Sequence, residues 1–141
     1  MSQSTPLVSA VVPTYNGAEF LRECFDSLLA QDMENIEVLI ADDGSTDETL
    51  EIAHSYSDPR LRVLPFDTRV GMASNWNRGF ASARGKYVSL VGQDDTVAPQ
   101  WARLLSELLE AHPESSLAFG HREFGVEDED SRRAIGDFFA T

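Results

Sequence analysis

The sequence lacks a long apolar run, contains a single cysteine and shows no obvious targeting segment. No stretch approaches the roughly 20 apolar residues that a membrane-spanning helix needs. Residues 1–5 are polar and lack the basic segment followed by an apolar stretch that marks a secretory signal. Cys24 alone cannot form an intramolecular disulfide, which is typical of a reducing compartment. These absences predict no membrane span in this chain and favour a cytoplasmic location.

Positive charge is also scarce, since 11 basic residues face 24 acidic ones and give a net charge of -13. A surface this acidic repels phosphate backbones, so nucleic acid is not expected as a partner. Part of the acidic excess lies in residues 127–130, a run that favours a solvated face or loop. The other carboxylates are more informative, because they recur in pairs. The 141 residues, 42% of them hydrophobic, are enough for one domain with a real core.

Apolar runs rich in β-branched residues alternate with segments of helical periodicity. The runs predict strands at residues 7–12, 36–41, 61–64, 87–91 and 117–119. The segments between them predict helices at residues 16–29, 45–56, 71–83 and 99–111. Strands that are apolar on both faces and alternate with helices indicate a mainly parallel sheet covered on both sides. The predicted fold class is therefore a three-layer α/β/α sandwich.

Local patterns indicate how the helices begin and which faces they bury. Two pairs, Asn16 with Glu19 and Ser45 with Glu48, have the spacing of capping boxes. Cys24 lies within the apolar stripe of the first helix, so we interpret it as a core residue and not as a nucleophile. The third helix carries Met72, Trp76, Phe80 and Ala83 along one face. In the last helix, the residues expected to face inward are Trp101, Leu104, Leu105, Leu108 and Leu109.

Paired aspartates follow two of the predicted strands, at the edge where parallel α/β sheets bind ligands. Asp42 and Asp43 follow the second strand, and Asp94 and Asp95 follow the fourth. Adjacent carboxylates repel each other, and a divalent cation such as Mg²⁺ or Mn²⁺ removes that cost. The alternative for Asp94 or Asp95 is that one of them caps the helix beginning near Pro99.

Other polar residues near these strand ends have both a structural and a functional interpretation. Asp43 precedes the expected Ser45 cap by two residues, and it could accept hydrogen bonds from a base or from ribose hydroxyls. Tyr15, at the end of the first strand, could flank a base or simply pack. Asn75 and Asn77 lie within a predicted helix, whose interior disfavours asparagine. Their side chains could bond to neighbouring loops or contact a ligand.

Five segments follow one another along the chain, namely Val-Val-Pro-Thr-Tyr-Asn (11–16), Asp-Asp-Gly-Ser-Thr-Asp (42–47), Asn-Trp-Asn-Arg-Gly (75–79), Ala-Arg-Gly-Lys-Tyr-Val (83–88) and Gln-Asp-Asp (93–95). In this order they resemble family 2 glycosyltransferases. The resemblance implies a GT-A fold and an inverting enzyme with an NDP-sugar donor, for which a UDP-sugar is preferred. It also implies Mn²⁺ or Mg²⁺ as cofactor and an unidentified glycan, lipid or other acceptor.

The same resemblance implies roles for particular residues. Pro13, Thr14, Tyr15 and Asp43 fall where the family holds the nucleotide base. Asp94 and Asp95 fall on the acidic element that contacts ribose and metal, with Asp95 the first choice as metal ligand. Many members carry a further aspartate two residues before this pair, where the present chain has Gly92.

The general base for an inverting transfer is not identified by the sequence. In the family it lies in the second half of the catalytic domain, and the late acidic candidates here are Glu123, Glu127 and Asp128. We therefore expect residues 1–141 to be the nucleotide-sugar-binding part of a catalytic domain, truncated before its acceptor half. The base would lie beyond Thr141, and the fragment alone would be weakly active or inactive.

Three other interpretations compete with this one. A non-catalytic nucleotide-sugar-binding module stays open as the alternative, because the base is not visible. A receiver-type phosphoacceptor domain would place its acidic pair after the first strand, whereas Asp42 and Asp43 follow the second. A dinucleotide-binding Rossmann domain would have a glycine-rich turn after the first strand, and residues 13–16 are not such a turn.

Overall fold

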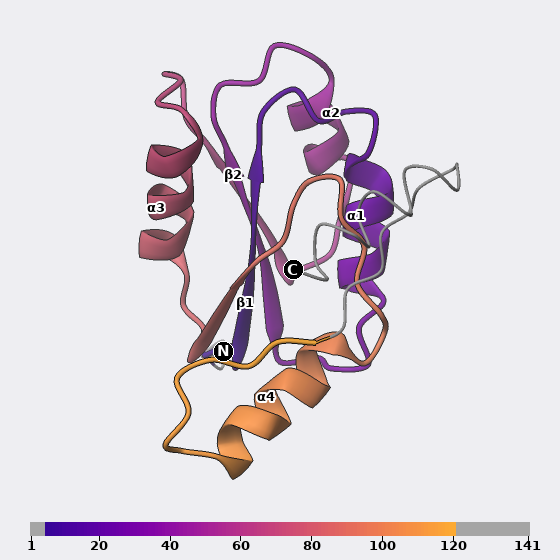
Figure 1. The fold of residues 1–141 in the computed structure, drawn as a ribbon. Coiled ribbons are helices and arrows are strands. Elements are labelled where there is room, and N and C mark those ends of the chain that lie inside the picture. The colour runs from indigo at the N-terminus through magenta and orange to yellow at the C-terminus, as the bar shows by residue number, and fades with distance from the viewer. Residues whose placement is uncertain (1–4, 121–141) are drawn as a thin grey trace, which may run out of the picture.

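Four strands form one sheet at the centre of the molecule (Figure 1). The computed structural model describes residues 5–120, and the strands are β1 (Val8–Thr14), β2 (Ile36–Asp42), β3 (Leu61–Pro65) and β4 (Tyr87–Leu90). Their order is β3-β2-β1-β4, and each pairing within the described residues is parallel. All the carboxyl ends therefore lie at one edge of the sheet. The four strands predicted first along the sequence are confirmed to within two residues at either end.

Helices cover both faces of this sheet (Figure 1). Helix α3 (Met72–Ser82) packs on one face, against β1 and β2. The opposite face carries α1 (Leu21–Leu29) and α2 (Thr49–His54). Helix α4 (Trp101–Ala111) lies beyond the amino ends of the strands. The prediction of a three-layer α/β/α sandwich with a parallel sheet is confirmed.

The main core lies between the sheet and α1 with α2. Alternate residues of the central strands point toward these helices, namely Val8, Ala10, Val12, Ile36, Val38 and Ile40. Helix α1 contributes Leu21, Cys24, Phe25 and Leu28, each fully buried. Burying a side chain of this size typically stabilises the fold by about 1.5–3 kcal/mol. Cys24 is therefore a core residue, as its place in the apolar stripe predicted.

Helix α3 approaches the sheet through small and polar residues, not through the apolar face expected from its sequence. Asn75 and Gly79 are its buried residues, whereas Met72 is 71% exposed and Phe80 is 41% exposed. A Cβ atom on Gly79 would come within 2.4 Å of Val11 Cγ1, so the absence of a side chain permits this close contact. The sheet face beneath α3 holds Val11, Leu39 and Ala41, which leaves little room for large side chains.

The two predicted capping boxes are wrong. The N-cap residues of α1 and α2 are Phe20 and Glu48, and neither makes a side-chain cap bond. Asn16 has a positive φ of 47°, and its Oδ1 accepts a hydrogen bond from Thr46 N–H at 2.8 Å. Ser45 Oγ in turn accepts one from Asn16 N–H at 2.9 Å. These residues thus join the loop after β1 to the loop after β2, because the parallel strands bring the two loops together.

Two expectations near the end of the described residues are also wrong. Leu104 and Leu108 of α4 are 49% and 47% exposed, so only part of the predicted inward face is covered. Residues 117–119 form no strand, and Leu117 and Phe119 are 76% and 83% exposed. Apolar periodicity predicts that a face is apolar, but it does not show which neighbour covers it. Across residues 5–120, every helix is too short or too polar to span a bilayer.

Candidate functional site

The carboxyl ends of β1 and β2 are fastened together by the buried side chain of Asp42. Its Oδ1 accepts a hydrogen bond from Thr14 Oγ1 at 2.9 Å, and its Oδ2 accepts one from Ser45 N–H at 2.9 Å. The Ser45 hydroxyl donates to the same carboxylate, and Asp42 is 0% exposed. Asp43 N–H also donates to Thr14 O at 2.9 Å. Asp42 therefore has a structural task, and Thr14, which is 2% exposed, shares it.

Asp43 connects this edge to the start of α3. Its two carboxylate oxygens accept hydrogen bonds from Val70 N–H and Gly71 N–H, each at 2.8 Å. The Arg78 guanidinium lies 4.0 Å from Asp43 Oδ1. Asp43 is only 3% exposed, but a carboxylate offers about four lone-pair positions, of which these amides use two. The structural role of Asp43 is to hold the backbone of Val70 and Gly71. Its contact with a nucleotide base stays a prediction.

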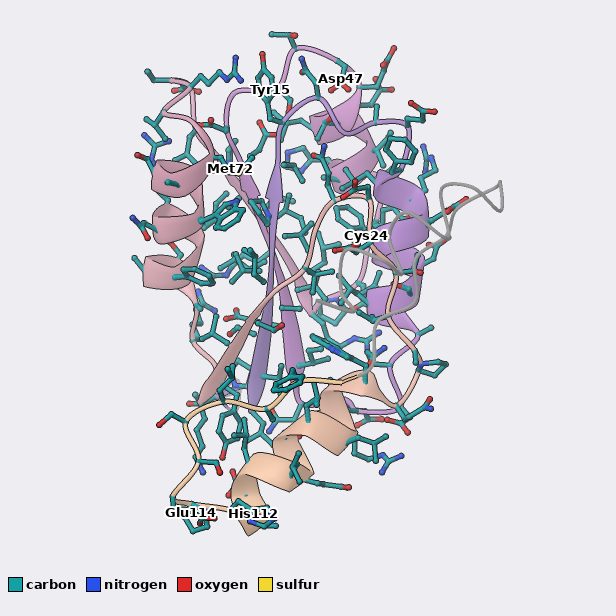
Figure 2. The ribbon with its side chains drawn as sticks, viewed as in Figure 1. Tyr15, Cys24, Asp47, Met72, His112 and Glu114 are labelled. Atoms are coloured by element: carbon teal, nitrogen blue, oxygen red, sulfur yellow. The ribbon has the colours of Figure 1, made fainter. Side chains whose placement is uncertain are left out.

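Tyr15 lies just beyond the end of β1, at the end of the molecule opposite His112 and Glu114 (Figure 2). The Arg69 guanidinium carbon lies 3.8 Å from the centre of its ring, a cation–π arrangement. The Arg78 guanidinium carbon lies 4.4 Å from the centre of the Phe66 ring, in a second cation–π arrangement. Pro13 precedes Thr14 in β1 and pairs with Ala41 of β2. The predicted base-binding residues thus share one edge of the sheet with two arginines.

Neither arginine was singled out from the sequence. Arg78 stood in a segment that carried the family resemblance, but without a role. Arg69 stood in no recognised motif. Only the fold places them beside Tyr15 and Asp43.

The acidic turn, residues 92–95, follows β4 at the same edge. Its shape is set by a hydrogen bond from Asp95 N–H to Gly92 O at 3.0 Å and one from Gly92 N–H to Asp95 Oδ2 at 3.2 Å. A Cβ atom placed on Gly92 would lie 2.9 Å from Asp94 Oδ1 and 2.8 Å from Asp95 Oδ2. The two carboxylates therefore converge over the bare backbone of Gly92. Neither residue caps α4, whose N-cap is Gln100.

Cys24 lies beneath the acidic turn, on α1. Its thiol donates a hydrogen bond to Gly92 O, with Sγ 3.4 Å from that oxygen. Burial, and then the negative charges of Asp95 and Asp94, raise the pKa of Cys24 to about 12. The thiol is therefore protonated at neutral pH, which makes it a poor nucleophile.

Gln93 ties the acidic turn to the end of β1, a contact that the sequence did not predict. Its Oε1 accepts a hydrogen bond from Tyr15 N–H at 3.0 Å, and its Nε2 lies 3.4 Å from Tyr15 O as donor. The turn with Asp94 and Asp95 is thereby held next to Tyr15. Residues predicted after the first and fourth strands do come together in space.

Two sets of predicted residues are not brought into this site. Asn75 Nδ2 donates to Ala41 O at 2.8 Å, and Asn75 is 3% exposed, so this side chain joins α3 to the end of β2. The late acidic candidates Glu123, Glu127 and Asp128 lie outside the described residues. Within residues 5–120, no three His, Cys, Asp or Glu side chains are grouped to hold a metal ion by themselves. An ion held by Asp94 and Asp95 would complete its shell with water or with ligands from a bound molecule.

Comparison with known proteins gives a consistent family assignment. The sequence model described as "Glycosyl transferase family 2" matches residues 9–139. The chain is 41% identical over 104 residues to the uncharacterized glycosyltransferase EpsJ of Bacillus subtilis, covering 72% of this chain and 30% of EpsJ. It is 42% identical over 93 residues to the glycosyltransferase GlyG of Streptococcus pneumoniae, covering 64% of this chain and 31% of GlyG. The chain thus spans about a third of the length of these relatives.

Two solved structures are also similar to this chain. S. aureus TarS 1-349, in complex with UDP-GlcNAc, superimposes with a TM-score of 0.73 at 29% identity. That alignment covers 86% of this chain and 37% of the TarS chain. The mannosyltransferase PcManGT from Pyrobaculum calidifontis, in complex with GDP-Man and Mn²⁺, gives a TM-score of 0.59 at 31% identity. This alignment covers 64% of the present chain and 28% of the PcManGT chain.

Proposed function

The chain belongs to glycosyl transferase family 2, and from that premise we propose that it is the donor-binding part of an inverting glycosyltransferase. It binds an NDP-sugar, preferably a UDP-sugar, together with Mn²⁺ or Mg²⁺, and the sugar passes to an acceptor hydroxyl. The observation that carries this proposal is the meeting of Tyr15, Asp43 and the acidic turn at one sheet edge. The TarS complex with UDP-GlcNAc and the PcManGT complex with GDP-Man support the choice of donor class.

The nucleoside would be held by residues 13–15 together with Asp43. Tyr15 supplies an aromatic surface, and the Arg69 guanidinium over its ring supplies hydrogen-bond donors for carbonyl oxygens of a base. Asp43 supplies acceptors for a base N–H through the lone pairs that Val70 and Gly71 leave unused. Thr14 acts through its place in the strand end, because its hydroxyl is already engaged with Asp42.

The chemistry of the acidic turn suits a divalent cation held partly by substrate. Asp94 Oδ1 and Asp95 Oδ2 both approach the backbone of Gly92, so two carboxylates lie at the same turn. Mg²⁺ typically uses one or two carboxylates and completes its shell with substrate phosphates and water. The two aspartates would hold the ion, and a bound ion supplies positive charge that offsets the charge of the diphosphate. The Mn²⁺ in the PcManGT complex supports this choice of cofactor.

In the transfer itself, an acceptor oxygen forms a bond to the sugar's anomeric carbon while the bond from that carbon to the diphosphate breaks. The acceptor's proton passes to a general base, which for this chain stays unassigned. The described residues contribute donor binding and orientation, which alone can lower a barrier by several kcal/mol. The acceptor, the general base and a cytoplasmic location stay predictions from the sequence. A non-catalytic donor-binding module is the alternative, and a product assay on a longer chain that includes the acceptor half separates the two.

The proposal is tested by calorimetry with UDP in the presence of Mn²⁺, of Mg²⁺ and of EDTA. We expect UDP to bind more tightly with either cation, and we expect Asp95→Ala to remove most of that gain. Uridine, which has no phosphate, should bind equally with and without metal and should be insensitive to Asp95→Ala. Glu107→Ala is the matched control, because Glu107 is an exposed acidic residue on α4, at the opposite end of the sheet. Equal UDP affinity in EDTA and in Mn²⁺ would exclude the metal role.

A further inference from the structure

The side chain of Gln93 bridges two parts of the donor site that come from distant parts of the chain. One part is the nucleoside-binding edge, residues 13–15 with Asp43, and the other is the acidic turn. We propose that Gln93 is a positioning residue that sets the spacing between them, so that base and cation are bound cooperatively. This inference rests on the proposed function and adds a residue for which neither the sequence motifs nor the comparisons give a role.

The contact has two points, which fixes orientation as well as distance. Gln93 Oε1 accepts from Tyr15 N–H at 3.0 Å, and Gln93 Nε2 donates to Tyr15 O at 3.4 Å. The two residues are 78 positions apart in sequence, and their contact is partly buried. Asp94 and Asp95 follow Gln93 directly, and successive Cα atoms are only about 3.8 Å apart. A shift of Gln93 therefore moves both proposed metal ligands relative to Tyr15.

Gly17 provides the space in which the Gln93 amide lies. A Cβ atom on Gly17 would come within 2.3 Å of Gln93 Oε1 and 2.6 Å of Gln93 Cδ. Gly17 is not among the glycines with positive φ, so backbone conformation does not require glycine there. Its N–H is fixed by a 2.8 Å hydrogen bond to Thr49 Oγ1. The absence of a side chain at Gly17 therefore leaves the space that the Gln93 amide occupies.

Each part of the site is also held by bonds of its own. Asp42 fastens the ends of β1 and β2, and the two hydrogen bonds between Gly92 and Asp95 shape the acidic turn. Cys24 contacts the turn from α1, not from β1. Removing the Gln93 amide should therefore leave both parts folded while loosening their relative position. This predicts a loss of cooperativity with little loss of nucleoside affinity.

The experiment measures the Mn²⁺ factor, which is the ratio by which Mn²⁺ tightens UDP binding, together with uridine affinity in EDTA. The variants are Gln93→Ala and Gln93→Met, the second of which keeps the length of the side chain but loses both hydrogen bonds. We expect the Mn²⁺ factor to fall by about fivefold or more in both, within the usual range of coupling between sites. Uridine affinity should change by less than about twofold, since nucleoside contacts stay in place. Gln100→Ala, at an exposed glutamine beside α4, should match the wild type.

Gly17→Ala gives an independent test, because it displaces the flexible end of Gln93 without altering that residue. It should lower the Mn²⁺ factor in the wild type and have no further effect in the Gln93→Ala background. If Gln93→Ala does not fold, Gly17→Ala alone decides the question.

Three outcomes would overturn the inference. An unchanged Mn²⁺ factor in Gln93→Met and Gly17→Ala would show that the bridge sets no spacing. Equal losses for uridine and UDP would show a merely structural role. A wild type without Mn²⁺-dependent UDP binding would refute the proposed function itself, and this inference with it.

Discussion

The hydroxyl of Thr14 donates a 2.9 Å hydrogen bond to the Asp42 carboxylate, and both side chains are almost completely buried. Asp42 and Asp43 are neighbours in sequence, yet they have different partners. Asp42 joins the ends of two strands, whereas Asp43 holds the backbone that leads into α3. Their substitution should therefore affect different properties of the protein.

Asp42→Ala should destabilise the fold strongly. The change leaves Thr14 Oγ1 and Ser45 N–H without their acceptor, and a buried polar group left unpaired costs about 1–3 kcal/mol. We expect the free energy of unfolding to fall by about 3 kcal/mol, measured by urea denaturation. Asp67→Ala, at an exposed aspartate in the loop after β3, should have little effect. A wild-type urea midpoint for Asp42→Ala would contradict the structural role of this carboxylate.

Asp43→Asn should weaken nucleoside binding whether or not metal is present. The amide keeps one acceptor for the Val70 and Gly71 amides but loses the charge and lone pairs available to a base N–H. Hydrogen bonds to charged groups contribute about 1.5–3 kcal/mol, so uridine affinity should drop by about tenfold or more. Calorimetry in EDTA measures the uridine affinity of the variant and of the wild type. Should uridine bind the variant as tightly as the wild type, Asp43 would have only its structural role.

The sequence predicted the central strands because they are buried on both faces, so that continuous runs such as residues 7–12 and 36–41 could be recognised without context. It also predicted the edge at which Asp43 and Asp95 lie, since parallel strands bring their carboxyl ends together. What it could not predict were partners distant in sequence. Asn16 and Ser45 had local capping patterns, but loop-to-loop hydrogen bonds replaced the caps.

The sequence does not show which distant residue a side chain will contact. Gln93 bonds to a residue 78 positions away, and no local pattern marks such a contact. Leu104 showed the opposite error, since helical periodicity marked it as buried although no neighbour in the described residues covers it fully. Both cases depend on three-dimensional arrangement, which local propensity does not encode.

Cys24 should resist alkylation in the folded protein. The thiol is fully buried, and its pKa is raised from 9.0 to about 12, so it stays protonated at pH 8. Iodoacetamide should react slowly with the native chain and rapidly in urea, as followed by mass spectrometry. The thiol ionises at a lower pH in the unfolded chain than in the folded chain. The free energy of unfolding should therefore fall as the pH rises from about 9 to about 12, and this group should not change it below pH 9. A native alkylation rate equal to that in urea would show that the thiol is accessible.

Gly79→Ala should displace α3 and, through it, weaken the nucleoside-binding edge. On an exposed helical surface this change would stabilise the protein by about 1 kcal/mol, because alanine favours helix. Here the new methyl group would lie 2.4 Å from Val11 Cγ1, and overpacking typically costs about 1–3 kcal/mol. The same helix carries Asn75, bonded to Ala41 O, and Arg78 beside Asp43. We therefore expect a lower melting temperature together with weaker uridine binding.

Ser74→Ala, at an exposed position of α3, is the matched control and should not lower the melting temperature. Val11→Ala removes the atom that the new methyl group would meet, but alone it leaves a cavity in the sheet face. In the double variant, the methyl group introduced by Gly79→Ala fills part of that cavity, so the two losses should not add. The double variant should therefore be more stable than the sum of the single changes predicts. If Gly79→Ala instead melted at or above the wild-type temperature, the close approach of α3 to β1 would be refuted.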